Sequence, residues 1–157
     1  MSSDEHRQHR GDREAAAGEV WQALYRLVFE REGQRRIHEA CDVVGLTPSV
    51  LKTLLQLSPD RPLPMRDLVE RFRCDPSYVT SLVDGLEAAG LAERQSHPTD
   101  RRVKVVALSR TGAGALAQVR KVLGEPPASF SALTTDDLFA LRALLAKVSD
   151  ADEAAGS

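Results

Sequence analysis

The chain has 157 residues, 42% of them hydrophobic, which suits one compact folding unit with its own core. Its two cysteines are too few for a secreted disulfide scaffold or a four-cysteine zinc site. The formal net charge of -2 gives the whole chain no attraction to nucleic acid, so any DNA affinity must come from a local patch.

The apolar runs of the chain are short. The longest runs, such as Val103 to Leu108 broken by Lys104, fall far below the roughly 20 residues of a membrane-spanning helix. The first residues are charged and lack the apolar stretch of a secretion signal. We therefore expect a cytoplasmic protein that is not inserted in a membrane.

The N-terminal third of the chain predicts a polar arm followed by helices. Residues 1–13 have no apolar period, which favours a disordered arm. Apolar residues then recur with a helical period from 14 to 44, which predicts one long helix, bent near Gly33 and ended by Gly45. Thr47 and Pro48 are typical of a helix start, so a short second helix should follow.

Two amphipathic helices joined by a three-residue turn come next. The turn is Arg73-Cys74-Asp75, and Asp75 with Pro76 predicts the start of the second helix, which ends at Gly90. Each helix has apolar residues at positions i, i+3, i+4 and i+7: Met65, Leu68, Val69 and Phe72 in the first, and Val79, Leu82, Val83 and Leu86 in the second. This pattern indicates a helix-turn-helix.

A β-hairpin is predicted directly after the helix-turn-helix. Residues 91–95 and 103–108 are strand candidates, and the turn-rich segment 96–100 separates them. Between Leu91 and Arg110 the chain carries five basic residues against two acidic ones, the only such cluster in its ordered part. A hairpin in this place, with this charge, is typical of a DNA-contacting wing.

The C-terminal part of the chain predicts two further helices. Ser109 can cap the first, and Pro126-Pro127 breaks the chain after it. Thr134 with Asp137 resembles a capping box and predicts the start of the last helix, after which 151–157 should form a loose tail.

The predicted fold class is mainly α (α+β), with six helices, a winged helix-turn-helix and a two-stranded β-wing. Residues 47–110 form the DNA-binding region, and 14–46 with 111–150 form a helical region from both ends of the chain. The helices over 14–44 and 112–148 carry more apolar surface than a small winged domain can cover, which predicts an obligate homodimer.

The helix after Asp75 should present a small, polar face to DNA. Its apolar residues occupy one side, which leaves Ser77, Tyr78, Thr80 and Ser81 on or beside the other. Hydroxyl groups there can bond base edges or phosphates in a major groove. A merely solvated helix more often carries Lys, Glu and Gln, so we interpret these four residues as the DNA readers.

The end of the hairpin turn carries Asp100-Arg101-Arg102. A guanidinium there can reach a minor groove while the carboxylate orients its neighbour. A charged tripeptide alone would more often be a solvated turn. Its place behind a helix-turn-helix favours DNA contact.

The sequence resembles the MarR family of bacterial regulators. The resemblance rests on the run from Cys74 to Glu87, on Gly90-Leu91, on Asp100-Arg101-Arg102 through Leu108 and Gly112, and on the order of the six helices. It implies a homodimeric regulator, often a repressor, that binds a pseudo-palindromic DNA operator. Asp100 and Arg102 match the family's wing motif. A basic residue is common after the recognition-helix threonine, whereas this chain has Ser81 there.

Many members of that family are released from DNA by small aromatic or anionic ligands, others by cysteine oxidation or metal. The resemblance therefore implies an effector cleft between the first helix and the DNA-binding region, near Trp21, Tyr25 or His38. The alternative interpretation, that Trp21 and Tyr25 are core or interface residues, is favoured by their aromatic character.

Other function classes have weaker support. The chain shows no nucleophile–base pair, no metal cluster and no phosphate-cradling glycine loop, so we expect neither an enzyme nor a cofactor. His38 and Cys41 alone do not predict a metal site. Both cysteines are interpreted as reduced thiols, and Cys74 as a buried structural residue. The remaining alternative is a winged helix that docks other proteins without binding specific DNA.

Overall fold

The computed structural model describes residues 2–97 and 99–155, without the side chains of residues 2–7, 10, 31, 152, 153 and 155. Pro98, which the sequence places in the wing turn, lies outside the described residues. The chain divides into two compact units, residues 1–124 and 125–157, which are described separately. No described helix is long and apolar enough to cross a membrane.

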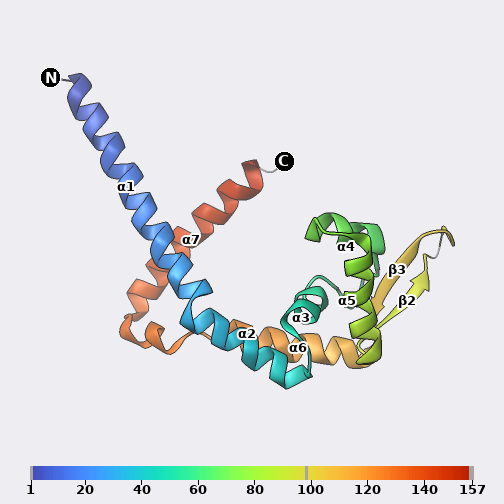
Figure 1. The fold of residues 1–157 in the computed structure, drawn as a ribbon. Coiled ribbons are helices and arrows are strands. Elements are labelled where there is room, and N and C mark those ends of the chain that lie inside the picture. Colours follow the sequence, from blue (N-terminus) through green and yellow to red (C-terminus); the bar gives the residue numbers. More distant parts are fainter. Residues whose placement is uncertain (1, 98, 156–157) are drawn as a thin grey trace. The chain divides into compact units, whose positions relative to one another are not determined.

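The region predicted as one bent helix forms two helices, α1 (Ser2–Phe29) and α2 (Arg31–Val44), as Figure 1 shows. The break is at Glu30, whose ψ of -131° is not helical. Gly33 permits this break, because any residue with a Cβ at that position would place it 1.5 Å from the carbonyl oxygen of Val28. The predicted end at Gly45 is confirmed, with that glycine in the left-handed conformation at φ 67°.

Both ends of the chain are more helical than the sequence predicted. The disordered arm expected over 1–13 is wrong for residues 2–13, since α1 begins at Ser2. The loose tail expected over 151–157 is likewise wrong for residues 151–155, which belong to the last helix. These end segments lack an apolar period and therefore have no packing face. Their Glu, Arg, Gln and Ala residues nevertheless favour a helix, because each segment extends a helix that the neighbouring residues have already nucleated.

The core of the first unit includes buried residues of α3 (Pro48–Leu54), α4 (Met65–Phe72) and α5 (Pro76–Ala88), together with residues of α2, the strands and the helix that follows the wing. The apolar face predicted for α5 is confirmed, because Val79, Leu82, Val83 and Leu86 are all buried. Arg73 ends α4 in the left-handed conformation, at φ 49°. The turn between the two helices of the helix-turn-helix is therefore as short as the sequence predicted.

The sheet has one strand more than the predicted hairpin. Strands β2 (Ala92–Ser96) and β3 (Lys104–Leu108) form the wing, and β1 (Leu63–Pro64) pairs with the other edge of β3, giving the antiparallel order β1-β3-β2. Val106 faces Arg94 on one side and Leu63 on the other. Both Val105 and Val106 are buried, so β3 is covered on its two faces and cannot show alternation.

Helix α6 (Arg110–Gly124) begins at a close contact with the wing. The Ser109 hydroxyl donates to the carbonyl oxygen of Gly90 at 2.7 Å and accepts from the Gly112 N–H at 2.9 Å, which confirms the predicted cap. A Cβ at Gly112 would lie 1.8 Å from the Leu91 carbonyl oxygen, so this helix packs backbone to backbone against the chain leading into β2.

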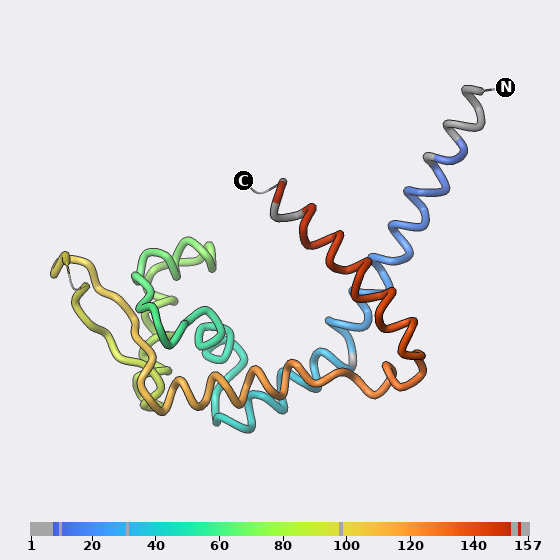
Figure 2. Tube along the Cα trace, turned by 180° about the vertical axis from the view of Figure 1, so that it is seen from behind, coloured from blue at the N-terminus to red at the C-terminus, as the bar shows by residue number. Residues whose placement is uncertain are grey.

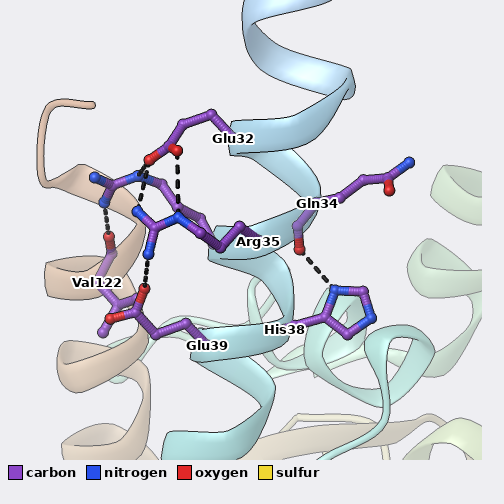
Figure 3. Close-up of polar contacts among 7 residues, drawn as sticks. Glu32, Gln34, Arg35, His38, Glu39 and Val122 are labelled. Atoms are coloured by element: carbon purple, nitrogen blue, oxygen red, sulfur yellow. Dashed lines mark hydrogen bonds and ion pairs between the residues drawn. The ribbon is translucent and has the colours of Figure 1, made fainter. Parts of the chain in front are cut away.

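Helices α2 and α6 lie side by side in Figures 1 and 2, and a charged network joins them. The Arg36 guanidinium donates to the Val122 carbonyl oxygen at 2.7 Å and to Glu32 at 3.0 Å. Glu32 also binds Arg35, which contacts Glu39 (Figure 3). Because Val122 is in the last turn of α6, Arg36 satisfies a carbonyl that the helix itself leaves without a partner.

The second unit consists of the 3-10 turn η1 (Ala128–Ala132) and helix α7 (Thr135–Ala155). The predicted capping box is confirmed: the Thr134 N–H donates to Asp137 at 3.0 Å, and the Asp137 N–H donates to the Thr134 hydroxyl at 3.2 Å. The Thr134 hydroxyl holds the pKa of the Asp137 carboxyl below its usual value.

Candidate nucleic-acid interface

The start of α5 is set by Asp75. Its carboxylate accepts hydrogen bonds from the hydroxyl of Ser77 at 2.6 Å and from the backbone N–H of Ser77 at 2.7 Å. These bonds, the hydroxyl first, hold the pKa of Asp75 below its usual value. The first turn of α5, which carries the predicted DNA readers, is therefore anchored by an ionised cap.

We expect Asp75→Ala to lower the urea midpoint of unfolding at neutral pH, because the variant loses this cap. A carboxyl whose pKa is lowered by folding stabilises the native state above its unfolded pKa. That contribution disappears as the pH falls through the folded pKa. The difference between wild type and variant should therefore shrink in acid. Asp60→Ala, at an exposed turn aspartate, is the control; an equal, pH-independent difference in both variants would contradict the assignment.

The four predicted readers all lie on the exposed side of α5. Tyr78 is 47% exposed, and Ser77, Thr80 and Ser81 are also exposed. The Thr80 hydroxyl donates to the Pro76 carbonyl oxygen at 2.9 Å, and the Ser81 hydroxyl donates to that of Tyr78 at 2.7 Å. Their oxygen lone pairs remain able to accept from base amino groups.

Arg94, one of the five basic residues between Leu91 and Arg110, has a positioning role in the structure that its sequence position does not reveal. From β2 it reaches α5, where its guanidinium pairs with Glu87 and, at 2.7 Å, with Asp84. The same group donates to the Thr80 carbonyl oxygen at 2.9 Å, and the Arg94 N–H donates to Glu87 at 2.7 Å. Arg94 thus ties the wing to the reading helix. The one hint of this contact in the sequence is that Asp84 and Glu87 are spaced i, i+3, which places both carboxylates on the same face of α5.

The end of the wing loop is closed by Asp100. Its carboxylate accepts from the backbone N–H of Arg102 at 3.0 Å, and its carbonyl accepts from Val103 at 3.0 Å. Asp100, Arg101 and Arg102 are all exposed. Among the described residues neither arginine side chain has a hydrogen-bond or ion-pair partner, so both guanidiniums are available to a ligand.

The residues predicted near an effector lie on two helices. Trp21, 65% exposed, and Tyr25, 52% exposed, are on α1, where the Tyr25 ring lies 5.0 Å from that of Phe29. His38 is on α2, with Nδ1 2.7 Å from the Gln34 carbonyl oxygen (Figure 3). A cavity of about 360 Å³ on α1 and α2 is not lined by any of the three. Their assignment to a ligand stays a prediction.

The two cysteines are free thiols in different surroundings. Cys41 is buried, and burial, with a smaller effect from Asp42, raises the pKa of its thiol. Cys74 is half-buried in the turn before α5. Within residues 2–97 and 99–155, no three His, Cys, Asp or Glu side chains are grouped so as to hold a metal ion.

The comparisons with known proteins identify the family. The model of the MarR family matches residues 46–104, a range that includes α3, α4, α5 and the wing loop. The HTH-type transcriptional repressor MdtR of Bacillus subtilis is 30% identical over 135 residues, covering 84% of this chain and 83% of that protein. The chain belongs to the MarR family. The resemblance inferred from the motifs around α5 and the wing is confirmed.

Two further matches agree with this assignment to the MarR family. The HTH-type transcriptional repressor NicR of Pseudomonas putida is 29% identical over 134 residues, which cover 85% of this chain and 84% of that protein. The crystal structure of a mutant MarR from E. coli complexed with operator DNA has 26% sequence identity and a TM-score of 0.53. That match covers 73% of this chain and 83% of the MarR chain.

Proposed function

We propose that this MarR-family protein is a transcriptional repressor that binds double-stranded operator DNA as a homodimer. Helix α5 enters the major groove, and the wing loop places Arg102, with Arg101 beside it, at the minor groove. The observation that carries the proposal is the joint presentation of an exposed hydroxyl-rich face on α5 and two guanidiniums without partners on the wing, linked by Arg94. Two relatives named as repressors and a neighbour complexed with operator DNA support it.

The charge distribution supports a local DNA site on a chain of net charge -2. Arg94 is neutralised by Asp84 and Glu87, so the phosphate-facing charge of the wing comes from Arg101, Arg102 and Lys104. Cations that neutralise phosphates release counterions, which makes binding dependent on salt. Since the reading side chains of α5 are uncharged, we assign most of the salt dependence to the wing.

The homodimer is inferred from apolar surface on both terminal helices. On α1 the exposed residues include Trp21, Tyr25 and Val28, spaced so that they form one stripe. On α7 they include Leu145 and Val148. Exposed apolar residues on each of these helices are typical of an interface. A two-fold dimer would bind a pseudo-palindromic operator, and we expect this complex in the cytoplasm, where such a regulator meets DNA.

The roles of the wing and of α5 can be separated by mutation. We expect Arg102→Ala to weaken binding to all operator variants and to flatten the salt dependence, because one cation fewer displaces counterions. Ser77→Ala, Thr80→Ala and Ser81→Ala should instead change the preference among operator variants, by about 1–3 kcal/mol where a base contact is lost. The measurement is a salt titration with a mutated-operator panel.

The variants compared should be dimers whose melting temperatures are measured first. Arg102→Ala, Thr80→Ala and Ser81→Ala should keep the value of wild type because these side chains are exposed, whereas Ser77→Ala also removes a hydrogen bond to the Asp75 cap. Unchanged affinity and salt slope in Arg102→Ala would show that the hairpin is not a DNA-contacting wing. The alternative from the sequence, a winged helix that docks other proteins, would then become the better explanation. None of the comparisons supports that alternative.

We further propose that a small aromatic or anionic compound releases the protein from DNA, through a cleft near Trp21, Tyr25 or His38. The support is family membership and the exposed aromatic side chains on α1. A mobility-shift assay with a panel of such compounds tests the idea. Insensitivity of DNA binding to the whole panel and to peroxide would remove this kind of control.

A further inference from the structure

A second cavity in the first unit, of about 630 Å³, has no assigned role. Its walls come from the end of α3, the loop leading to β1, helix α4, His97 just after β2, and α6. Leu57 and Leu63, which line it, are buried. No residue of α5 lines it, so the cavity lies apart from the exposed hydroxyl face of that helix. Its volume suits a small molecule.

The cavity has a strong excess of positive charge. Its charged lining residues are four arginines and one aspartate: Arg61, Arg66, Arg71, Arg120 and Asp67. Asp67 lies 3.3 Å from Arg66, and Arg71 donates to the neutral Gln56. Within the described part of the chain, the side chains of Arg61 and Arg120 have no hydrogen-bond or ion-pair partner. Three positive charges are therefore left without a balancing carboxylate.

The start of α4 adds backbone donors to the same cavity. Pro64, the N-cap residue, lines it together with Arg66 and Asp67 of the first turn. No side chain caps this helix, so the N–H groups of its first turn have no capping acceptor. Free N–H groups and the positive end of the helix dipole favour an anion. The arginines and the helix end thus favour the same kind of ligand.

We propose that this cavity binds a small molecule carrying a phosphate group. A phosphate monoester has a charge of about -1.5 to -2 at neutral pH and three acceptor oxygens, which match several guanidiniums better than a single carboxylate does. No Phe, Tyr or Trp is among the described lining residues, and His97 is the one aromatic ring there, so the lining favours an anion over an aromatic compound. His97 follows β2, and its N–H donates to the Val103 carbonyl oxygen at 2.9 Å where the wing loop begins, so an occupant would contact the wing loop.

The test is calorimetric titration of the full chain, without DNA, at matched ionic strength. Inorganic pyrophosphate serves as the probe and benzoate as the aromatic monoanion. We expect saturable binding of pyrophosphate and at least tenfold weaker binding of benzoate. Arg61→Gln with Arg120→Gln should weaken pyrophosphate binding about tenfold or more. Arg13→Gln with Arg110→Gln removes the same charge outside the cavity and should leave the affinity unchanged.

Absence of saturable pyrophosphate binding by wild type would overturn the proposal, as would equal affinity in the cavity variant. A third outcome would also overturn the proposal: the cavity variant binds pyrophosphate normally but loses affinity and salt slope on every operator. These arginines would then contact the DNA backbone instead. Because the titration contains no DNA, a negative result leaves the proposed repressor function intact.

Discussion

A variant with Val28→Asp and Val148→Asp is expected to be monomeric and to bind operator DNA at least about a hundredfold more weakly than wild type. Val28 on α1 is 53% exposed and Val148 on α7 is 61% exposed, so neither supports the fold of the isolated chain. In a dimer interface each aspartate would become a buried charge without a partner. A monomer also loses the avidity of two linked half-sites, which is about 10²–10⁴.

Light scattering at micromolar concentration gives the oligomeric state, and a mobility shift gives the affinity. Val28→Thr with Val148→Thr is the matched control, because threonine keeps the shape of valine without adding a charge. Its circular dichroism and that of the aspartate variant should equal wild type. A wild-type protein that is monomeric under these conditions, or an aspartate variant that stays dimeric, would refute the interface formed by α1 and α7.

Substitution of Arg94, which links the wing to α5, should have the second largest effect on DNA affinity. Arg94→Ala is expected to lower the affinity for all operator variants about tenfold or more and to reduce the free energy of unfolding by about 1–3 kcal/mol. The variant frees the wing from α5. It also leaves Asp84 and Glu87 without their cation, on the helix that we propose enters the major groove.

The two causes can be separated by a second substitution. Glu87→Gln added to Arg94→Ala removes one freed carboxylate, so it should restore affinity only to the extent that charge repulsion caused the loss. Arg94→Lys keeps the charge but lacks the planar fork that reaches Thr80 and both carboxylates, and an intermediate affinity is expected. Wild-type affinity in Arg94→Ala would show that the wing is held in place without this contact.

Short-range patterns were enough to predict helix α5 and the caps that begin α5 and α6. Asp75 and Ser109 cap helices because a side chain need only reach an N–H group two or three residues away. The buried face of α5 follows from the 3.6-residue period of its apolar side chains. The exposed position of Ser77 and Thr80 then follows, because it is the opposite side of the same helix.

Contacts between distant parts of the chain were decided only by the tertiary structure. Strand β1 has two residues, one of them a proline, and exists only because Leu63 meets Val106 across the sheet. Arg94 and Arg36 resembled ordinary surface cations until folding brought Thr80 and Val122 within hydrogen-bond distance. The cavity lined by Arg61 and Arg120 likewise joins residues from α6 and the β1 loop. Periodicity and capping report a residue's neighbours along the chain, whereas these partners are set by how the core packs.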